Sequence, residues 1–351
     1  MRSAGWPRCV HDRRKRACYR RAVKLSGQHV LVTGGAGFVG RAVVRGLRRA
    51  GARVTVADCV AFPDPGVTTV VGDLGDPQTR DAAVTEGLDG IVHLAAATSV
   101  LRSVEDPAGV YRANVAVTAG LLELARVRGV GRFLLSSTNA VVGDVGQATI
   151  REDAPLRPLT PYGATKAACE MLLCGYAGAY GLAACALRLT NVYGPGMSHK
   201  DSFVARVMRA ARAGGGVQVY GDGTQRRDLV HVDDVVRGVL LAWQRRCGGS
   251  LILGSGRSVT VLELLELARR VTGRPLPATH VAPRAGEMPA VIVDITRARR
   301  LGWAPTVTLE QGLGSVWADF TAADGAAAAA DGVAAPEPAA AGRPTAQRPR
   351  R

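Results

Sequence analysis

Short hydrophobic runs alternate with longer stretches of helical periodicity through the first half of the chain. The short runs are rich in Val, Ile and Leu, as buried strands are, and lie at residues 29–34, 53–58, 67–73, 90–96 and 132–137. Between them, residues 38–51 and 107–129 space their apolar side chains at three and four residues, as one face of a helix does. This alternation predicts an α/β fold, with a doubly wound parallel sheet covered by helices on both faces.

The second half of the chain has a looser pattern. A long helix is predicted over residues 162–181 and a strand over 182–190. Three later segments are rich in Gly, Pro and charge and are interpreted as loops, at residues 191–202, 214–228 and 274–290. Helical periodicity returns at residues 232–243 and 260–273. We therefore expect a sheet domain over residues 26–190 and a smaller C-terminal substrate-binding lobe over 191–320, interleaved with the last sheet elements.

The two ends of the chain differ from its middle. Residues 1–22 carry eight Lys or Arg against one acid, a net +7 of the +16 on the whole chain. We expect residues 1–25 to be a disordered basic leader and the Ala/Pro-rich residues 321–351 a disordered tail. We hypothesise that translation begins near Val23, just before the first strand. Met171 is the first Met after Met1, so this start would use a codon other than AUG. A basic arm can bind phosphate backbones, so a nucleic-acid-associated protein or a noncatalytic dinucleotide-binding scaffold remains an alternative to an enzyme.

Seven cysteines are scattered without a CxxC pair or a His at metal-ligand spacing. This favours reduced thiols in a cytoplasmic protein without a metal site. No apolar run is long enough to cross a membrane.

A glycine-rich turn follows the first strand, with Gly34, Gly37 and Gly40 leading into the first helix. Glycines there allow a tight turn and let backbone N–H groups approach a pyrophosphate. Asp58 ends the second strand, about 20 residues on, where a carboxylate accepts hydrogen bonds from ribose hydroxyls and repels a 2′-phosphate. The pattern predicts a dinucleotide site that prefers NAD to NADP.

Two later strand ends complete this predicted site. Asp73 and Leu74 end the third strand and are placed to touch the adenine. The fourth strand ends in "HLAA", residues 93–96, where small residues let the cofactor pass close to the backbone. His93 lies within the strand pattern, so we expect a hydrogen-bonded core histidine and not a catalytic base.

Tyr162 and Lys166 are four residues apart and so share one helical face. A free tyrosine, with a pKa of about 10, is a poor base at neutral pH. An adjacent ammonium and a positively charged nicotinamide ring would stabilise its phenolate. Such a tyrosine can remove a hydroxyl proton while hydride leaves the same carbon.

The ordered motifs resemble the extended short-chain dehydrogenase/reductase family, within its nucleotide-sugar epimerase/dehydratase group. The resemblance covers about residues 28–320 and includes the glycine turn, "HLAA", "SST", "YGATK", "RLTNVYGPG", "GDGTQRRD", "HVDDVV" and "PRAGE". It implies a Rossmann-type sheet domain that binds NAD. The cofactor contacts that it implies are Gly34, Gly37, Phe38, Val39, Gly40, Asp58, Asp73, Leu74, Leu94, Ala95, Ala96, Asn114, Ser136, Tyr162 and Lys166.

The resemblance implies that Thr138 hydrogen-bonds the reacting sugar oxygen and forms a catalytic set with Tyr162 and Lys166. It also implies that Ser136 and Ser137 approach the nicotinamide. Family members that eliminate water between C5 and C6 follow this threonine with Asp-Glu, an acid and a base. Here Asn139 and Ala140 follow it, which disfavours a 4,6-dehydratase.

The resemblance also implies the substrate contacts. Asn191 matches a residue that contacts the bound sugar nucleotide, and Arg227 and Arg284 match arginines that hold its diphosphate. Lys200 and Arg206 could meet an acidic sugar or simply coat a helix. Asp233 and Asp234 open a helix, and we interpret both as structural.

These features predict an NAD-dependent 4-epimerase that transiently oxidises C4 of a UDP- or dTDP-hexose. A decarboxylase, a dehydratase or a one-way C4 oxidoreductase of the same family is the alternative within this chemistry. We expect a homodimer formed through residues 106–129 and 162–181, with no membrane and no specific nucleic acid as partner.

Overall fold

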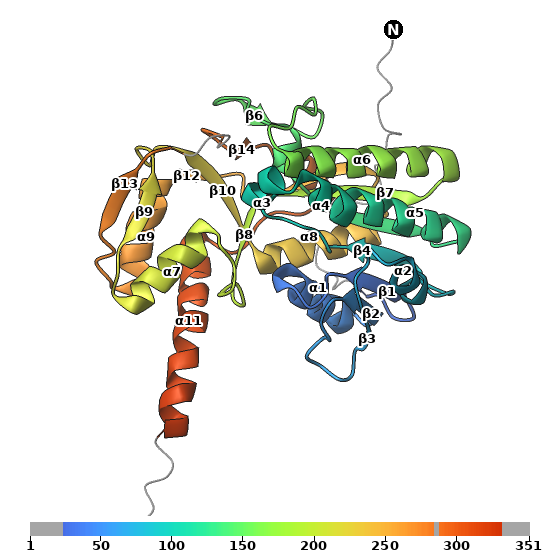
Figure 1. Cartoon of the computed structure of the whole chain (residues 1–351), viewed down its shortest axis with the longest axis horizontal. Helices are drawn as coiled ribbons and strands as arrows, with labels where there is room; N and C mark the ends of the chain where they lie inside the picture. The colour runs from blue at the N-terminus through green and yellow to red at the C-terminus, as the bar shows by residue number, and fades with distance from the viewer. Residues whose placement is uncertain (1–23, 284–287, 332–351) are drawn as a thin grey trace, which may run out of the picture.

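The computed structural model describes residues 24–283 and 288–331. Seven parallel strands form its central sheet, in the order β11-β7-β5-β4-β1-β2-β3 (Figure 1). Their bounds are β1 His29–Thr33, β2 Arg53–Asp58, β3 Thr68–Val71, β4 Gly90–His93, β5 Arg132–Thr138, β7 Ala183–Leu189 and β11 Gly249–Leu253. The chain winds outward from β1 in one direction and from β4 in the other. The predicted doubly wound sheet is confirmed, with its switch point between β1 and β4.

Helices cover both faces of this sheet. Those of the sheet domain are α1 Phe38–Arg49, α2 Pro77–Ala83, α3 Val100–Glu105, α4 Pro107–Tyr111, α5 Val117–Val127, α6 Pro161–Tyr180 and α8 Val232–Gln244. Alternation along β1 decides the packing: Val30 and Val32 join a core with α1 and α8, whereas Leu31 joins a core with α2, α5 and α6. Each central strand is buried on both faces, and this explains its continuous hydrophobic sequence.

The predicted helix over residues 107–129 is interrupted. Between α4 and α5 the chain makes one π-helical turn, Arg112–Ala116, which contains Asn114. Such a turn shifts the side-chain register and is common at functional sites. Sequence periodicity did not predict this interruption, because a single π turn leaves apolar residues at helical spacing on both sides.

The smaller lobe contains more regular structure than predicted. Its strands are β8 Asn191–Tyr193, β9 Val217–Tyr220, β10 Arg226–His231, β12 Ser258–Thr260 and β13 Ala278–Val281, and its helices are α7 Phe203–Ala213, α9 Val261–Thr272 and α11 Leu309–Asp331. Helix α10 Thr296–Leu301 packs instead against β11 of the central sheet. The short strands β6 Thr149–Ile150 and β14 Ile292–Val293 pair with each other. The loop assignment of residues 191–202, 214–228 and 274–290 was therefore wrong in part. Short strands among Gly and Pro give little periodic signal.

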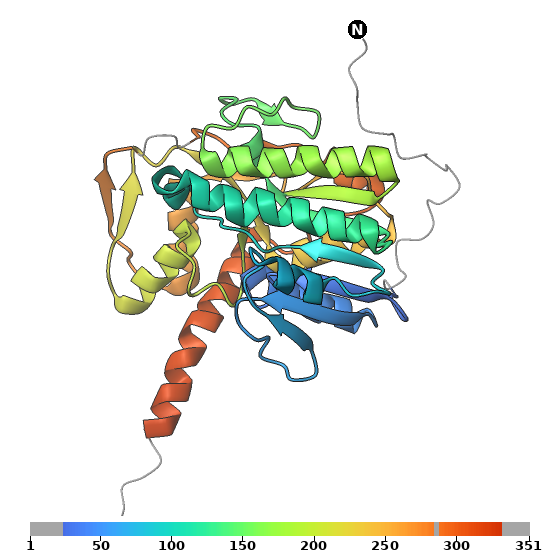
Figure 2. The same ribbon diagram turned by 45° about the vertical axis from the view of Figure 1, so that its right-hand side comes forward.

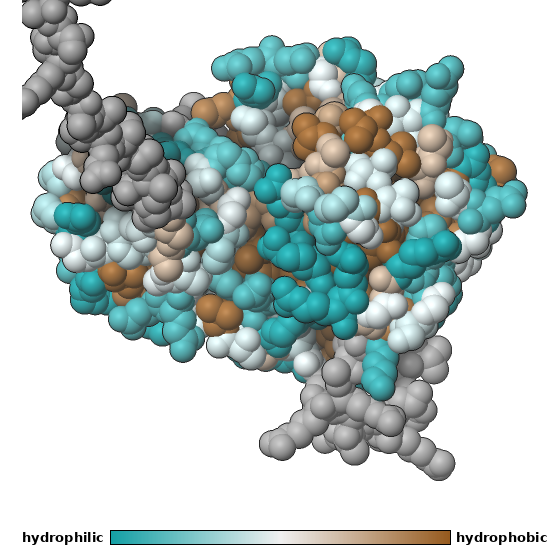
Figure 3. Space-filling view, turned by 90° about the horizontal axis from the view of Figure 1, so that it is seen from below, coloured by the Kyte–Doolittle hydropathy of each residue, from teal (hydrophilic) through white to brown (hydrophobic). Residues whose placement is uncertain are grey.

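Helix α11 begins in the smaller lobe and extends away from the body of the molecule (Figures 1 and 2). It continues to Asp331, so the expected tail boundary at residue 321 is corrected. Residues 332–351, and the leader up to residue 23, lie outside the described residues. The face of the molecule that is seen from below is mostly hydrophilic, with smaller hydrophobic areas (Figure 3). No helix within the described ranges is long and apolar enough to cross a bilayer.

Candidate active site

A cleft of about 580 Å³ opens at the carboxyl ends of the central strands, beside the switch point. Open parallel sheets bind ligands at this place because the two halves of the winding diverge there. All predicted cofactor contacts except Asn114 line the cleft, together with Thr138. Residues at the ends of β1 to β5 and from helices α1 and α6, distant in sequence, thus meet in one site.

The glycine-rich turn is built so that no side chain could replace two of its glycines. Gly34 has φ +67°, and a Cβ there would lie 2.6 Å from the Ala95 nitrogen. A Cβ on Gly40 would lie 2.0 Å from the Gly34 carbonyl oxygen. Gly37 is the N-cap of α1, so the free N–H groups of the first helical turn face the cleft. This cradle suits the pyrophosphate of a dinucleotide.

Asp58 stands at the end of β2 and fixes the glycine-rich turn. Its Oδ2 accepts the backbone N–H of Ala36 at 2.9 Å. The carboxylate lines the cleft together with Asp73 and Leu74 from the end of β3. Arg53, at the other end of β2, instead bonds His29 at 2.7 Å. No arginine is among the described residues that line the cleft, so the carboxylate of Asp58 fits NAD better than NADP.

Asn114 does not line the cleft, and the prediction of a direct cofactor contact is corrected. Its side chain accepts the N–H of Ala97 at 2.8 Å and donates to the Ala97 carbonyl and to Thr165. These bonds hold the loop after β4, and residues 94–96 of that loop line the cleft. Asn114 therefore shapes the site from behind.

His93 is a core residue, as predicted. Its ring nitrogens bond Thr33 at 2.6 Å and Thr118 at 3.1 Å. Burial, and then the positive charge of Lys166, lower the pKa of His93 to about 3. The imidazole is therefore neutral and already bonded on both sides, so it is unavailable as a base.

Thr138 and Tyr162 meet at the end of β5. The Thr138 hydroxyl oxygen accepts the N–H of Ala140 at 3.2 Å and caps the short turn Asn139–Val141. Burial raises the pKa of the Tyr162 phenol to about 12, while its hydrogen bond with Thr138 acts in the opposite direction. Burial thus favours the neutral phenol, whereas the hydrogen bond from Thr138 favours the phenolate that proton removal requires.

Lys166 is buried one helical turn after Tyr162. Its Nζ donates to the backbone carbonyl of Ser136 at 2.9 Å. Burial lowers the pKa of Lys166, whereas the neighbouring Cys169 and Glu170 act to raise it. The ammonium is thus fixed at the end of β5, within the same cleft as Thr138 and Tyr162.

Ser137 makes a contact that the sequence did not predict. Ser137 is among the residues that line the cleft, but its hydroxyl donates to Oε1 of the buried Glu170 at 2.5 Å. The expectation that this hydroxyl approaches the nicotinamide is corrected. In a strand, neighbouring side chains point to opposite sides, so Ser137 points behind the site.

A second cavity of about 210 Å³ adjoins the cleft, since Val192 lines both. It is lined by the predicted Asn191 and Arg227, and also by Tyr220 and Gln225, which sequence reasoning missed. Arg227 donates to the carbonyls of Arg226 and Met288, each at 2.9 Å. Arg226, its neighbour on β10, lines a different cavity, as expected from strand alternation.

The other proposed substrate contacts have different outcomes. Arg284 lies outside the described residues. Arg206 lines the second cavity, with its guanidinium over the rings of Phe203 and Tyr220, so it does more than coat α7. Lys200 lines the cofactor cleft.

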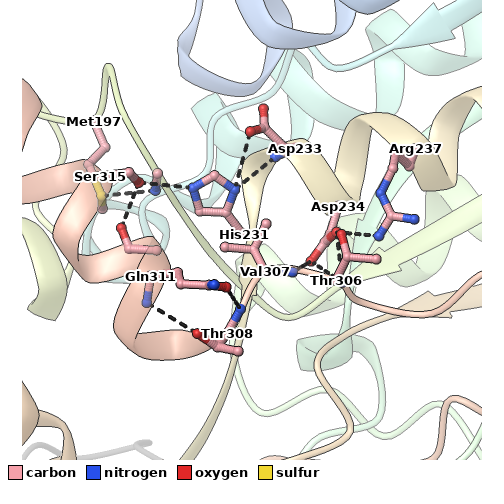
Figure 4. Close-up of polar contacts among 12 residues, drawn as sticks. Met197, His231, Asp233, Asp234, Arg237, Thr306, Val307, Thr308, Gln311 and Ser315 are labelled. Carbon is pink, nitrogen blue, oxygen red and sulfur yellow. Dashed lines mark hydrogen bonds and ion pairs between the residues drawn. The ribbon is translucent and has the colours of Figure 1, made fainter.

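Asp234 is structural, as predicted. Its buried carboxylate accepts the N–H groups of Thr306 and Val307 and pairs with Arg237 (Figure 4). These bonds fasten the segment before α11 to α8. Asp233 lies beside His231, whose ring also contacts Ser315 of α11. Neither acid belongs to the cleft or to the second cavity.

Comparisons with known proteins agree with this geometry. The chain is 38% identical to a UDP-glucose 4-epimerase of Streptomyces lividans, over 80% of this chain and 92% of that protein. It is 36% identical to a dTDP-glucose 4,6-dehydratase of Streptomyces griseus, over 81% and 92%.

Two solved structures share the fold. The UDP-glucose 4-epimerase of Thermotoga maritima, solved with UDP-glucose, has a TM-score of 0.81 and 34% identity, over 84% of this chain and 99% of that one. The UDP-glucose 4-epimerase of Thermus thermophilus, solved with NAD, has a TM-score of 0.80 and 32% identity, over 84% and 100%. The family model matches residues 30–254, and the chain belongs to the NAD dependent epimerase/dehydratase family.

Proposed function

We propose that this protein is a nucleotide-sugar 4-epimerase that holds NAD in the cleft. The observation that carries the proposal is the convergence of Thr138, Tyr162 and Lys166 in one cleft with the glycine-rich turn and Asp58. The relatives named UDP-glucose 4-epimerase support UDP-hexoses as the first substrates to test. When bound, NAD supplies a hydride acceptor and donor for C4 of the sugar.

Tyr162 is the base in this mechanism. It removes the proton of the C4 hydroxyl as hydride leaves C4, and it returns the proton to the 4-keto oxygen when hydride comes back to the other face. Before that proton transfer Tyr162 is the phenolate. Thr138 donates to this phenolate or to the sugar oxygen, and Lys166 stabilises negative charge at both. Arg227 and Asn191 hold the nucleotide portion, so that the sugar can turn between the two hydride transfers.

The residues after Thr138 favour epimerisation over dehydration. Asn139 is buried, with an amide directed to the Leu189 carbonyl at 3.5 Å, and Ala140 has no ionisable group. Neither residue lines the cleft. No acid–base pair for elimination of water therefore follows Thr138, although dehydratases are among the relatives.

A second candidate is chemistry on an acidic sugar, favoured by the ammonium of Lys200 in the cleft. A solved neighbour at 35% identity, MoeE5, is in complex with UDP-glucuronic acid and NAD. Uronate epimerisation or decarboxylation would use the same C4 oxidation. A nucleic-acid-associated or scaffold role has weaker support, because it gives the clustered Thr138, Tyr162 and Lys166 no purpose.

The deciding experiment offers UDP- and dTDP-sugars, uronates included, to the purified protein without added nucleotide. We expect a C4 epimer of unchanged mass, detected by chromatography and mass spectrometry, and no product from Tyr162→Phe. Loss of water or of carbon dioxide would identify a dehydratase or a decarboxylase instead. Absence of any product across the panel would contradict the proposed activity.

A homodimer is part of the proposal. Helices α5 and α6 lie side by side (Figures 1 and 2). Met171 and Tyr180 of α6 are exposed by more than half, as is Tyr111 at the end of α4, which also contacts α6. A hollow beside them is lined almost entirely by apolar residues, including Leu172. We expect Met171→Glu to convert a dimer into a monomer in light scattering, whereas a wild-type monomer would contradict this interface.

The thiols support a cytoplasmic location as a further part of the proposal. Within the described residues, five cysteines form no disulfide: Cys59, Cys169, Cys174, Cys185 and Cys247. Reduced thiols are typical of the cytoplasm. Fractionation of the native cells tests this expectation.

A further inference from the structure

Three buried side chains behind the site form one polar cluster. Ser137 of β5 and Arg188 of β7 are register partners on adjacent parallel strands, so their side chains leave the same face of the sheet. Both reach Glu170 of α6. The Ser137 hydroxyl donates to Oε1 at 2.5 Å, and Nη2 of Arg188 donates to Oε2 at 2.8 Å.

The cluster is closed to water and continues across the sheet. Side-chain exposure is 1% for Glu170 and 4% for Arg188. Nη1 of Arg188 donates to the Glu152 carbonyl at 3.1 Å, and the Glu152 carboxylate accepts the N–H of Ile252 of β11 at 3.1 Å. Three neighbouring strands are thus tied to one helix through a buried ion pair. Such pairs are weak evidence for stability, and their best-supported role is to select one arrangement of the chain.

The residues on both sides of Ser137 belong to the catalytic set. The Ser136 carbonyl accepts from Lys166, and Thr138 bonds Tyr162. Glu170 follows Lys166 by one helical turn. Three residues of α6, each one helical turn after the last, therefore form hydrogen bonds with three successive residues of β5.

We propose that Ser137, Glu170 and Arg188 act as positioning residues, which fix the end of β5 against α6 so that Thr138 and the Ser136 carbonyl stay aligned with Tyr162 and Lys166. This inference rests on the proposed function, since it concerns the same reaction. None of the three side chains needs to touch the sugar or the cofactor. Removing the cluster lowers the rate of the chemical step and leaves binding of both ligands largely intact.

The cluster also acts on Lys166 through charge. The groups around this ammonium are Cys169 and Glu170 on α6, His93 on β4 and the Ser136 carbonyl on β5, with Arg188 of β7 behind Glu170. Burial lowers the pKa of Lys166, and Glu170 opposes that shift. Loss of the Glu170 charge therefore lowers the pKa of Lys166 further, so the ammonium is lost at a lower pH.

The test replaces the pair together, because a single replacement would leave a buried charge alone. Glu170→Leu combined with Arg188→Met is expected to fold and to keep NAD, with KM changed about twofold at most and kcat about ten- to a hundredfold lower. The alkaline limb of its kcat profile moves to lower pH. Ser137→Ala lowers kcat less and leaves that limb in place. Ser103→Ala, which removes a buried hydroxyl of α3, is the matched control and leaves kcat unchanged.

A readout independent of turnover separates this inference from the proposed function. The chain has four lysines, Lys15, Lys24, Lys166 and Lys200, so carbon-13 NMR of labelled lysine can follow Lys166, assigned with Lys166→Arg. We expect its pKa to fall in the paired variant, because Glu170 acts directly on Lys166 and the guanidinium of Arg188, lost with it, lies behind Glu170. An unchanged Lys166 titration with wild-type kcat would overturn the inference. If the wild type processes no sugar, the proposed function fails, and a Lys166 titration unchanged in the paired variant still overturns the inference.

Discussion

Thr138 hydrogen-bonds the phenol of Tyr162 while its own oxygen accepts the N–H of Ala140 at 3.2 Å. The amide uses one of the two lone pairs of the hydroxyl oxygen, and the hydroxyl hydrogen remains available for donation to Tyr162. This bond lowers the pKa of Tyr162 against the effect of burial, which raises it to about 12.

Replacement of Thr138 by Val should therefore move the pH dependence of kcat toward higher pH. Only the phenolate of Tyr162 can act as the base, and loss of the hydrogen bond raises the pKa of the phenol. At any pH below that pKa, a smaller fraction of the enzyme is then active. We expect kcat to fall at least tenfold near neutral pH and to recover partly as pH rises toward about 10.

Thr138→Ser is the matched control for this variant, because it keeps the hydroxyl and should keep the wild-type profile. A profile of kcat between about pH 6 and 10 provides the measurement. If Thr138→Val lowers kcat equally at every pH, the threonine acts on the sugar oxygen and not on the pKa of Tyr162.

Asp58 should decide both retention of NAD and discrimination against NADP. Its carboxylate lines the cleft and accepts the Ala36 N–H at 2.9 Å. Replacement by Ser removes a charged acceptor, and a hydrogen bond to a charged group contributes about 1.5–3 kcal/mol, so NAD should bind at least tenfold more weakly.

Calorimetric titration of the cofactor-free protein with NAD and with NADP measures both effects of Asp58→Ser. The preference for NAD should shrink, because the repulsion of a 2′-phosphate is gone. Asp64→Asn is the control, since Asp64 is exposed and pairs with Arg48 outside the cleft. If Asp58→Ser still discriminates against NADP as strongly as wild type does, the ribose does not contact Asp58.

Arg227 should contribute to substrate binding, and Arg226 provides a control on the same strand. Arg227 lines the cavity beside the cleft, whereas Arg226 lines another one. Arg227→Ala should raise KM for a nucleotide sugar about ten- to a hundredfold, because a charge-assisted contact to phosphate is lost. Steady-state kinetics should show a much smaller rise for Arg226→Ala. Equal effects of the two variants would mean that Arg227 acts only through the stability of β10.

The elements of the sheet domain could be predicted because each carries its own periodic signal. The continuous apolar runs of β1, β4 and β5 result from burial on both faces. The glycine turn predicts the cofactor cleft. Contacts between distant residues could not be predicted in this way. Nothing near Ser137 in sequence indicates that its hydroxyl meets Glu170, 33 residues later. Asn114 fits a cofactor motif, yet the π turn directs its side chain to Ala97.

The position of Lys200 could not be predicted from sequence either. Its sequence context suggests a surface lysine, whereas the fold places it in the cleft. Its loop packs against the start of α1. Met197 shares a core with Phe38 and Ala42. Burial, and then the charges of Lys200 and Arg41, lower the pKa of His199. The acid next in sequence, Asp201, pairs instead with Arg206 and Arg209 of α7. Lys200 thus lines the same cleft as the N-terminus of α1, which would face a pyrophosphate.

Replacement of Lys200 by Met should therefore weaken the retention of NAD. We expect the purified variant to carry less NAD than wild type and to lose it faster as salt is raised, because a favourable contact with a doubly charged pyrophosphate is absent. Lys24→Met is the matched control, since Lys24 is exposed and lies outside the cleft. Release of NAD by acid, followed by quantification, measures its content. If Lys200→Met keeps its NAD and instead loses activity only toward a uronate, the ammonium recognises the carboxylate of an acidic sugar.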